Sequence, residues 1–274
     1  MTIRNIYQIL SSKKRSLSIL FSTIYDIGLP RLFLRLRYEL RKSLDCKLPA
    51  SILNYLYIEK KYILNKSIDF DYTNPISIPL KNSNILKENI INFNFLNETK
   101  SLEIPFSWNS SKFSRLWIFN LNYFNWAREW LEIKLINGKW PFEAGYLEFF
   151  IDNWIKSNPI STFDSWHSYV TSLRIRNWFI LFFVCPDLAN EFRIKSFWRQ
   201  ICWLDSHPEV CHGGNHWIEN LTALILSSFY FNSNRSRIIF EKSLKLLKKE
   251  LYLQILEDGG HQERSASYHI IILD

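Results

Sequence analysis

From Ser111 onward, apolar residues recur every three to four positions over most of the chain, which is the period of an α-helix. The apolar positions form stretches of about 12 to 22 residues, a usual length for helices of globular proteins. Short breaks rich in Pro, Gly and Asn separate them at residues 137–138, 157–159, 186–187, 207–208, 232–234 and 257–260. Short connections make successive helices pack as antiparallel neighbours, so the pattern predicts about six or seven helices in a bundle, a solenoid or a ring of helical hairpins.

Two further patterns precede this region and divide the chain into three parts. Residues 1–66 look helical apart from a break at Gly28-Leu29-Pro30, because proline cannot continue a helix from within. Residues 67–107 are richer in Asn, Ser and Pro, and the run Ile90–Phe95 alternates like a strand. We therefore expect a helical N-terminal appendage, a linker with one or two short strands, and a main helical domain at residues 108–274. The fold class predicted in this way is all-α.

Several stretches bear on membrane contact. The most apolar run, Trp178–Cys185, is too short to cross a bilayer and predicts a buried helix. Lys13-Lys14-Arg15 precedes a short apolar run without a small-residue cleavage site, so we expect neither a cleaved signal nor a transmembrane span. The segment from Leu29 to Leu44 mixes apolar residues with arginines, a pattern that fits a membrane surface. We favour the alternative that this helix packs on the main domain.

Composition narrows the class of protein. With 274 residues, of which 47% are hydrophobic, the chain can bury a large core and is not disordered. Most of the 11 tryptophans and 13 tyrosines are expected in that core, although aromatic rings also line clefts that stack on sugars or bases. The net charge of +8 favours an anionic partner without choosing among acidic polysaccharide, nucleic acid and membrane. Cys185 and Cys202 lie in apolar stretches, so we expect buried thiols and no disulfide framework.

Two polar clusters near the C-terminal end carry the candidate chemistry. They span residues 213–220 and 258–269, and each follows a Gly-Gly pair, so that four of the seven glycines lie there. Glycine is used where the backbone turns tightly or approaches another group closely. We therefore expect both clusters to open helices that face a common cleft, as in an enzyme site.

The spacing within the clusters suggests proton transfer. On a helix, Asn215, His216 and Glu219 project near one edge, where His216 can transfer a proton and Glu219 can orient its ring. Arg264 and Tyr268 are four residues apart, and Tyr268 is a possible proton donor, or a base if a neighbouring cation lowers its pKa. The structural alternative is that Asn215 caps a helix while His216 and Tyr268 pack in the core.

The same residues bear on two other chemistries. His212, His216, Cys211 and Glu219 resemble metal-ligand spacing, but Gly213 and Gly214 interrupt the helix that would hold them, so we expect no metal and no other cofactor. A glycoside hydrolase would pair two carboxylates such as Glu219 and Glu263. The sequence does not fix the separation of these two groups.

The segments Gly214–Asn220 and Gln254–His269 resemble the heparinase II/III-like family of polysaccharide lyases, with weaker echoes at Trp108-Asn109 and at residues 116–124. The similarity covers roughly residues 90–274. It implies an incomplete (α/α) toroid followed by a β-sandwich domain that completes the cleft. It also implies β-elimination, in which the proton at C5 of a uronic acid is removed and the C4 glycosidic oxygen leaves.

The resemblance assigns roles to individual residues. Asn215 and His216 would bind and neutralise the uronate carboxylate, and an electrostatic contribution of this kind is often the largest in catalysis. Tyr268 would be the catalytic base or acid, and Glu219 matches an acidic position that is functional in some members. We expect His261, Glu263 and Arg264 around them, as substrate contacts or as supports.

The end of the chain adds an expectation about completeness. An apolar helix predicted from near Glu263 is still running at Asp274, and the β-sandwich of the family, with its further active-site histidine, is absent. We therefore expect a truncated toroid with impaired activity on its own, and a separate chain that could supply the missing domain. The competing readings are an inactive remnant or carbohydrate-binding helical domain, and a glycoside hydrolase on a similar ring.

The expected partners and location follow from the same resemblance and charge. We expect an acidic uronate polysaccharide as partner, no nucleic acid, and peripheral membrane contact through the N-terminal region. The compartment favoured is the cytoplasm or the inner-membrane surface, with the periplasm as the alternative.

Overall fold

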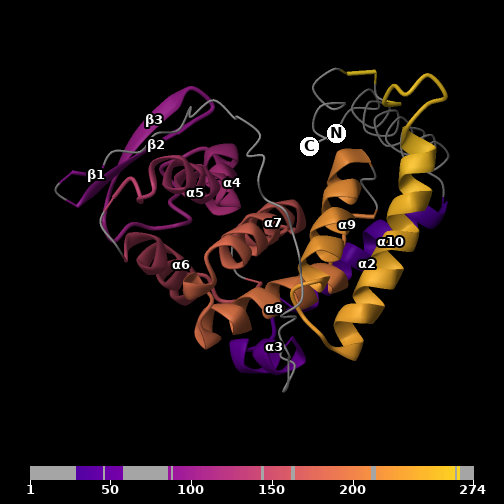
Figure 1. Ribbon diagram of the computed structural model, residues 1–274. Coiled ribbons are helices and arrows are strands. Elements are labelled where there is room, and N and C mark those ends of the chain that lie inside the picture. The colour runs from indigo at the N-terminus through magenta and orange to yellow at the C-terminus, as the bar shows by residue number, and fades with distance from the viewer. Residues whose placement is uncertain are drawn as a thin grey trace, which may run out of the picture.

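The computed structural model describes residues 29–45, 47–57, 86–87, 89–142, 145–161, 164–210, 214–262 and 264–265 (Figure 1). These residues are mostly helical, with one small sheet. The elements in chain order are α2 (Leu29–Asp45), α3 (Ala50–Leu56), β1 (Leu86–Lys87), β2 (Ile90–Phe95), β3 (Glu98–Glu103), α4 (Arg115–Tyr123), α5 (Asn125–Asn137), α6 (Tyr146–Ser157), the 3-10 turn η1 (Asp164–Trp166), α7 (Ser168–Val184), the 3-10 turn η2 (Pro186–Leu188), α8 (Glu191–Ser206), α9 (Gly214–Ser228) and α10 (Asn234–Gln254).

Helix α7 is the centre of the helical body. It lies between α4 and α5 on one side and α9 on the other, with α8 below it in Figure 1. Its apolar residues are buried nearly all round, including Trp178 and Phe182, because neighbouring helices cover every side. The prediction of a buried helix at Trp178–Cys185 is confirmed.

A fully buried arginine ties α7 to its neighbours. Arg174 donates through Nε to Gln200 Oε1 of α8 at 2.7 Å and through Nη1 to the Ser165 carbonyl of η1 at 2.8 Å. Its guanidinium also lies 4.0 Å from the ring centroid of Trp154 in α6. Burial lowers the pKa of Arg174 well below its ordinary value, so its polar contacts carry the stabilisation of this group.

The predicted breaks coincide with helix ends, and their residues explain why. Gly138, with φ 72°, ends α5 in the left-handed conformation that glycine adopts readily, and Ser233 starts α10 with a capping box. One break was not predicted: Phe124 divides α4 from α5 with φ 64°. This conformation is costly for a non-glycine residue, but the buried Phe124 ring stacks on Trp108 at 5.6 Å and is held there.

The predicted strand at Ile90–Phe95 is observed as β2, the centre of a three-stranded antiparallel sheet. Ile91 pairs with Leu102 of β3, and Leu96 and Asn97, with φ 57° and 62°, form the tight turn between the strands. Ile91, Phe93 and Phe95 face the core, and Phe93 packs edge-on against Trp126 at 5.3 Å. The fold is therefore mostly helical with a sheet integrated into its core.

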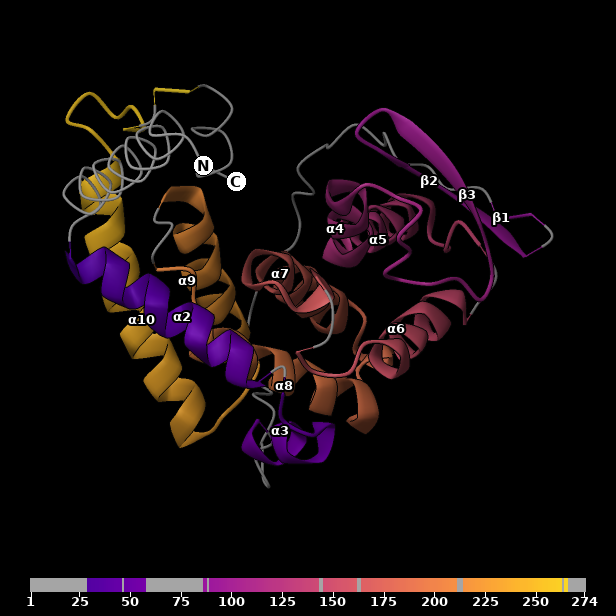
Figure 2. The ribbon, with the colours of Figure 1, turned by 180° about the vertical axis from the view of Figure 1, so that it is seen from behind.

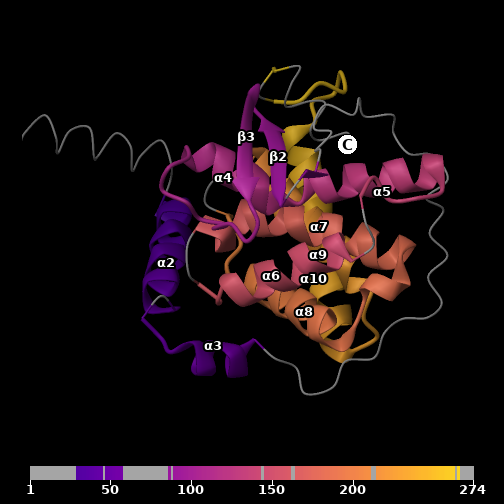
Figure 3. The same cartoon turned by 90° about the vertical axis from the view of Figure 1, so that its left-hand side faces the viewer.

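Helix α2 packs on the main body, as favoured from the sequence. The Tyr38 hydroxyl lies 3.3 Å from Ser168 Oγ at the start of α7, and Asp45 Oδ2 lies 2.7 Å from His207 Nε2 after α8. Tyr57, after α3, donates to the same Asp45 oxygen at 3.0 Å. Figures 2 and 3 show α2 on the outside of the helical body.

The remaining predictions concern the membrane, the cysteines and the last helix. No helix in the described ranges is long and apolar enough to cross a membrane. Cys185 and Cys202 are buried with free thiols, as expected. Arg264 and Ser265 are not helical, and the rest of the helix predicted from near Glu263 lies outside the described residues.

Stability should fall on mild acidification because of His207. Burial lowers the pKa of His207 to about 4, although Asp45 favours the charged form. The unfolded chain takes up this proton near its ordinary pKa of about 6.5. The contribution to stability is therefore present above that value and is lost as the pH falls toward 4. We expect a loss of about 1 kcal/mol in the free energy of unfolding between about pH 7 and pH 5.5.

Urea unfolding of the wild type and of a His207→Gln variant at both pH values measures this loss. The variant should lack the part of the pH dependence that His207 causes. An equal loss in both proteins would contradict the assignment.

Candidate functional site

The first polar cluster opens a helix, as predicted. Helix α9 begins at Gly214, which has φ 57°, and Asn215 and His216 follow in its first turn, each partly exposed. The N–H groups of a first helical turn have no partners within the helix, and they carry partial positive charge. This end of α9 therefore favours negatively charged groups.

The second Gly-Gly pair forms a turn after α10, and no helix starts there within the described residues. The Leu256 N–H donates to the Gly260 carbonyl at 2.8 Å, and Ile255 forms an antiparallel bridge with His261. Arg264 is exposed and has φ 51°. Glu263 and Tyr268, which the sequence predicts in this part of the site, lie outside the described residues.

A single glutamine links the two clusters. Gln254 Oε1 lies 2.9 Å from His261 Nε2, and Gln254 Nε2 donates to the Gly214 carbonyl at 3.3 Å. His261 is buried and does not face solvent. It is linked to the start of α9 through Gln254. The first turn of α9 and the turn after α10 are therefore neighbours in space.

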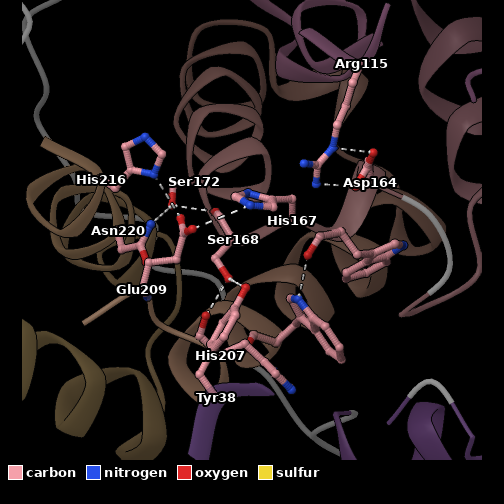
Figure 4. A network of polar contacts seen from close by, with 12 residues as sticks. Tyr38, Arg115, Asp164, His167, Ser168, Ser172, His207, Glu209, His216 and Asn220 are labelled. Carbon is pink, nitrogen blue, oxygen red and sulfur yellow. Dashed lines mark hydrogen bonds and ion pairs between the residues drawn. The ribbon is translucent and has the colours of Figure 1, made fainter. Parts of the chain in front are cut away.

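His216 belongs to a row of three ionisable side chains (Figure 4). The Glu209 carboxylate lies between two histidines: its Oε2 is 3.4 Å from His216 Nδ1, and its Oε1 is 3.5 Å from His167 Nε2. The Glu209 side chain is only 1% exposed, whereas that of His216 is 38% exposed. The row therefore connects a buried carboxylate to an imidazole that solvent and ligands can reach.

Glu209 is held in place through its backbone. Its N–H donates to Asn220 Oδ1 of α9 at 2.8 Å, and Asn220 Nδ2 donates to Ser172 Oγ of α7 at 2.8 Å. Asn220 is fully buried, so water does not compete for the hydrogen bonds of its Oδ1 and Nδ2 atoms. The loop after α8 is thus fixed between α7 and α9, and His167, at the N-cap of α7, completes the row.

Aromatic rings set the orientation of His216. Its ring stacks on Tyr169 with centroids 4.1 Å apart, and Tyr169 packs edge-on against Tyr123 at 6.0 Å. Burial, reinforced by Tyr169 and Glu209, raises the pKa of Tyr123 well above its ordinary value. Tyr123 therefore stays protonated at neutral pH and serves as a packing surface.

Glu219 has a different partner from the one predicted. It accepts two hydrogen bonds from Arg176 Nη1 of α7, at 2.7 and 3.0 Å, and it is buried. Glu219 lies three positions after His216 on the same helix, but the Arg176 guanidinium of α7 holds its carboxylate. Glu209, from another loop, is the carboxylate beside His216, and this corrects the expectation that Glu219 orients that ring.

A pocket of about 490 Å³ adjoins the row at His167. Its walls combine aromatic rings with short polar side chains, and they are built by Tyr38, Asn109, Ser110, Ser111, Phe113, Arg115, Ile118, Ser161, Asp164, Trp166, His167, Ser168, Trp203 and His207. Arg115 and Asp164 form a bidentate pair at 2.8 Å on one side of it (Figure 4). Aromatic faces with a few oriented polar groups are typical of ligand pockets.

The arrangement can orient and transfer a proton. His216 lies beside the Glu209 carboxylate, which favours the charged form of the ring, and its side chain is 38% exposed, so a ligand can reach it. Asn215 adds an uncharged amide at the same helix end. These are the parts needed to bind a carboxylate and to assist loss of a nearby proton.

His167 and Glu209 were not predicted from the sequence. They lie 49 and 7 residues before His216 in separate loops, so no helical spacing connects them. In the part of the chain that the structure describes, no three His, Cys, Asp or Glu residues are arranged to hold a metal ion. His212 and Cys211 lie outside it.

Comparisons with known proteins give no assignment. No protein-family model, no curated protein and no solved structure matches this chain.

Removing the Glu219 carboxylate should destabilise the fold. Arg176 would then lose two hydrogen bonds to a charged acceptor in a largely buried place, at a cost of about 2 kcal/mol. Urea unfolding of Glu219→Ala measures this. A double variant, Arg176→Met with Glu219→Leu, should recover part of the loss because both charged groups of the pair are replaced by apolar side chains.

The matched control is the exposed pair of Glu191 and Lys195, where Glu191→Ala should change stability little. If Glu219→Ala were as stable as this control, the structural role of Glu219 would be wrong.

Proposed function

We propose that this chain is the helical part of a lyase that cleaves uronic-acid-containing polysaccharide by β-elimination. The observation that carries the proposal is the start of α9, where partly exposed Asn215 and His216 lie at a helix N-terminus and buried Glu209 stands behind His216. This combination suits a substrate carboxylate. The resemblance of residues 214–220 and 254–269 to heparinase II/III-like lyases agrees with it, and α4–α10 would then form part of an (α/α) toroid.

The reaction would divide between binding and proton transfer. Asn215, His216 and the N–H groups of α9 would hold the uronate carboxylate and reduce its charge, which makes the C5 proton more acidic. Tyr268 would take that proton as base. The C5–H electron pair then forms the C4–C5 double bond, the C4–O bond breaks, and the leaving oxygen receives a proton from the acid form of the same or a neighbouring group.

The pocket beside His167 would bind a neighbouring sugar of the same polymer. Trp166, Trp203 and Phe113 offer ring faces, and the pair of Arg115 and Asp164 offers both donors and acceptors. The net charge of +8 favours an acidic polymer over a neutral one. The basic N-terminal region fits a location in the cytoplasm or at the inner membrane surface, with the periplasm as the alternative.

The activity is tested on a panel of uronate polysaccharides, both sulfated and unsulfated. We expect the ultraviolet absorbance of an unsaturated uronate to rise with at least one of them. Tyr268→Phe should lose most turnover, and His216→Ala should lose about a hundredfold or more. Tyr252→Phe, at an exposed tyrosine of α10, is the matched control and should keep full turnover. Full turnover of Tyr268→Phe would remove it from the mechanism.

Glu209 should act as a positioning residue. Glu209→Gln keeps the shape but removes the charge beside His216, so we expect kcat to fall about tenfold to a hundredfold with a smaller change in KM. The pH profile of kcat should also shift, which a purely structural role would not cause. Glu257→Gln, an exposed control, should leave both parameters and the profile unchanged.

A second candidate function is carbohydrate binding without catalysis, and the aromatic pocket favours it. Binding of a uronate oligosaccharide with no unsaturated product from any polymer would select this function. A glycoside hydrolase is disfavoured because Arg176 occupies the Glu219 carboxylate. Cleavage without ultraviolet absorbance would nevertheless identify a hydrolase.

A further inference from the structure

One face of helix α2 is apolar and exposed. Phe33, Leu36, Leu40 and Leu44 are each between 55% and 66% exposed. Steps of three and four residues separate them, so they form one continuous stripe along the helix. Single exposed apolar residues are common on proteins, whereas a stripe of four large side chains marks an interaction surface. We call these four residues the α2 stripe.

The helix cannot turn this stripe inward. Tyr38 and Asp45, seven residues apart on another side of α2, contact Ser168 and His207 of the main body. Rotation about the helix axis would break both contacts and expose buried His207. The α2 stripe is therefore held facing outward, and Figure 3 shows α2 along the edge of the molecule.

Helix α2 is itself basic. Residues 29–45 hold five Lys or Arg residues against two Asp or Glu residues, so the helix carries a net charge of +3. Exposed Arg37 follows Leu36 directly, within the span of the stripe. An apolar stripe with cationic neighbours is complementary to a surface that has apolar chains below negative headgroups.

We propose that α2 docks this protein through the α2 stripe on the surface of a bilayer that contains anionic phospholipid. The helix lies in the plane of the membrane, with the stripe at the boundary of headgroups and acyl chains and Arg37 among the phosphates. The contacts of Tyr38 and Asp45 with the body are kept. The binding is peripheral, and it does not depend on the proposed lyase activity.

A bilayer is favoured over a second copy of the chain. In a symmetric dimer across the α2 stripe, helix α2 of one copy, with its net charge of +3, would face the same helix of the other, and this repulsion opposes association. Anionic headgroups neutralise the same charge.

Sedimentation of the full chain with lipid vesicles tests the proposal. We expect at least tenfold tighter binding to vesicles of equal parts phosphatidylglycerol and phosphatidylcholine than to pure phosphatidylcholine, with a loss of binding at high salt. A double variant, Leu36→Glu with Leu40→Glu, should bind the anionic vesicles at least tenfold more weakly. Arg37→Glu should weaken binding several-fold and reduce its salt dependence.

The controls place the same changes on other helices. Ile136→Glu on α5, at a side chain that is 69% exposed, and Arg237→Glu on α10 should bind the anionic vesicles as the wild type does. Far-ultraviolet circular dichroism checks that each variant is folded.

Three results would overturn the proposal. The first is a wild type that does not sediment with anionic vesicles, and the second is a folded double variant that binds them unchanged. The third is a wild-type dimer, seen by light scattering, that the double variant converts to monomer, because the stripe would then be covered by a second copy.

Discussion

The buried guanidinium of Arg174 is the constraint on which the arrangement of helices depends. One side chain on the central helix reaches η1, α8 and the ring of Trp154 in α6, so it fixes three neighbours relative to α7. Asn122 extends the same network, since its Nδ2 donates to the Trp108 carbonyl at 3.0 Å and its Oδ1 accepts from Trp154 at 2.8 Å. A buried guanidinium is tolerated only when its N–H groups have hydrogen-bond partners. The aromatic side chains of the core could pack in several ways, and the polar network around Arg174 favours the one arrangement that provides these partners.

The candidate site follows from this packing. Once η1 and α8 are fixed on α7, the N-cap His167 and the loop that carries Glu209 are brought beside the start of α9, and Asn220 joins that loop to α7. Gln254 then supports the first turn of α9 from α10. The partly exposed imidazole of His216 rests on groups that are almost completely buried. His216 therefore has a rigid position, as the proposed proton transfer requires.

The sequence predicted local features well and contacts between distant segments poorly. Helix periodicity and glycine or proline breaks located the helices after Ser111 and the strand Ile90–Phe95, because both signals depend on neighbouring residues. The division at Phe124 has no signal in the sequence, because tertiary packing alone stabilises its conformation. Glu219 was paired with His216 because helix spacing was the only geometry available. In the structure Arg176 is the partner of Glu219, and Glu209 lies beside His216. Both contacts result from the packing of α7, α8 and α9.

The position of Tyr38 and His207 gives α2 a role in whatever the pocket binds. Both residues form part of the pocket wall, and both are contacts of the α2 segment with the body. A ligand that touches Tyr38 in this pocket has more affinity for the form with α2 in place than for any form without it. Thermodynamic linkage then requires the reverse: whatever holds α2 in place increases the affinity of the pocket by the same factor. Binding of a ligand in the pocket and attachment of α2 to the body are thus coupled, and each one favours the other.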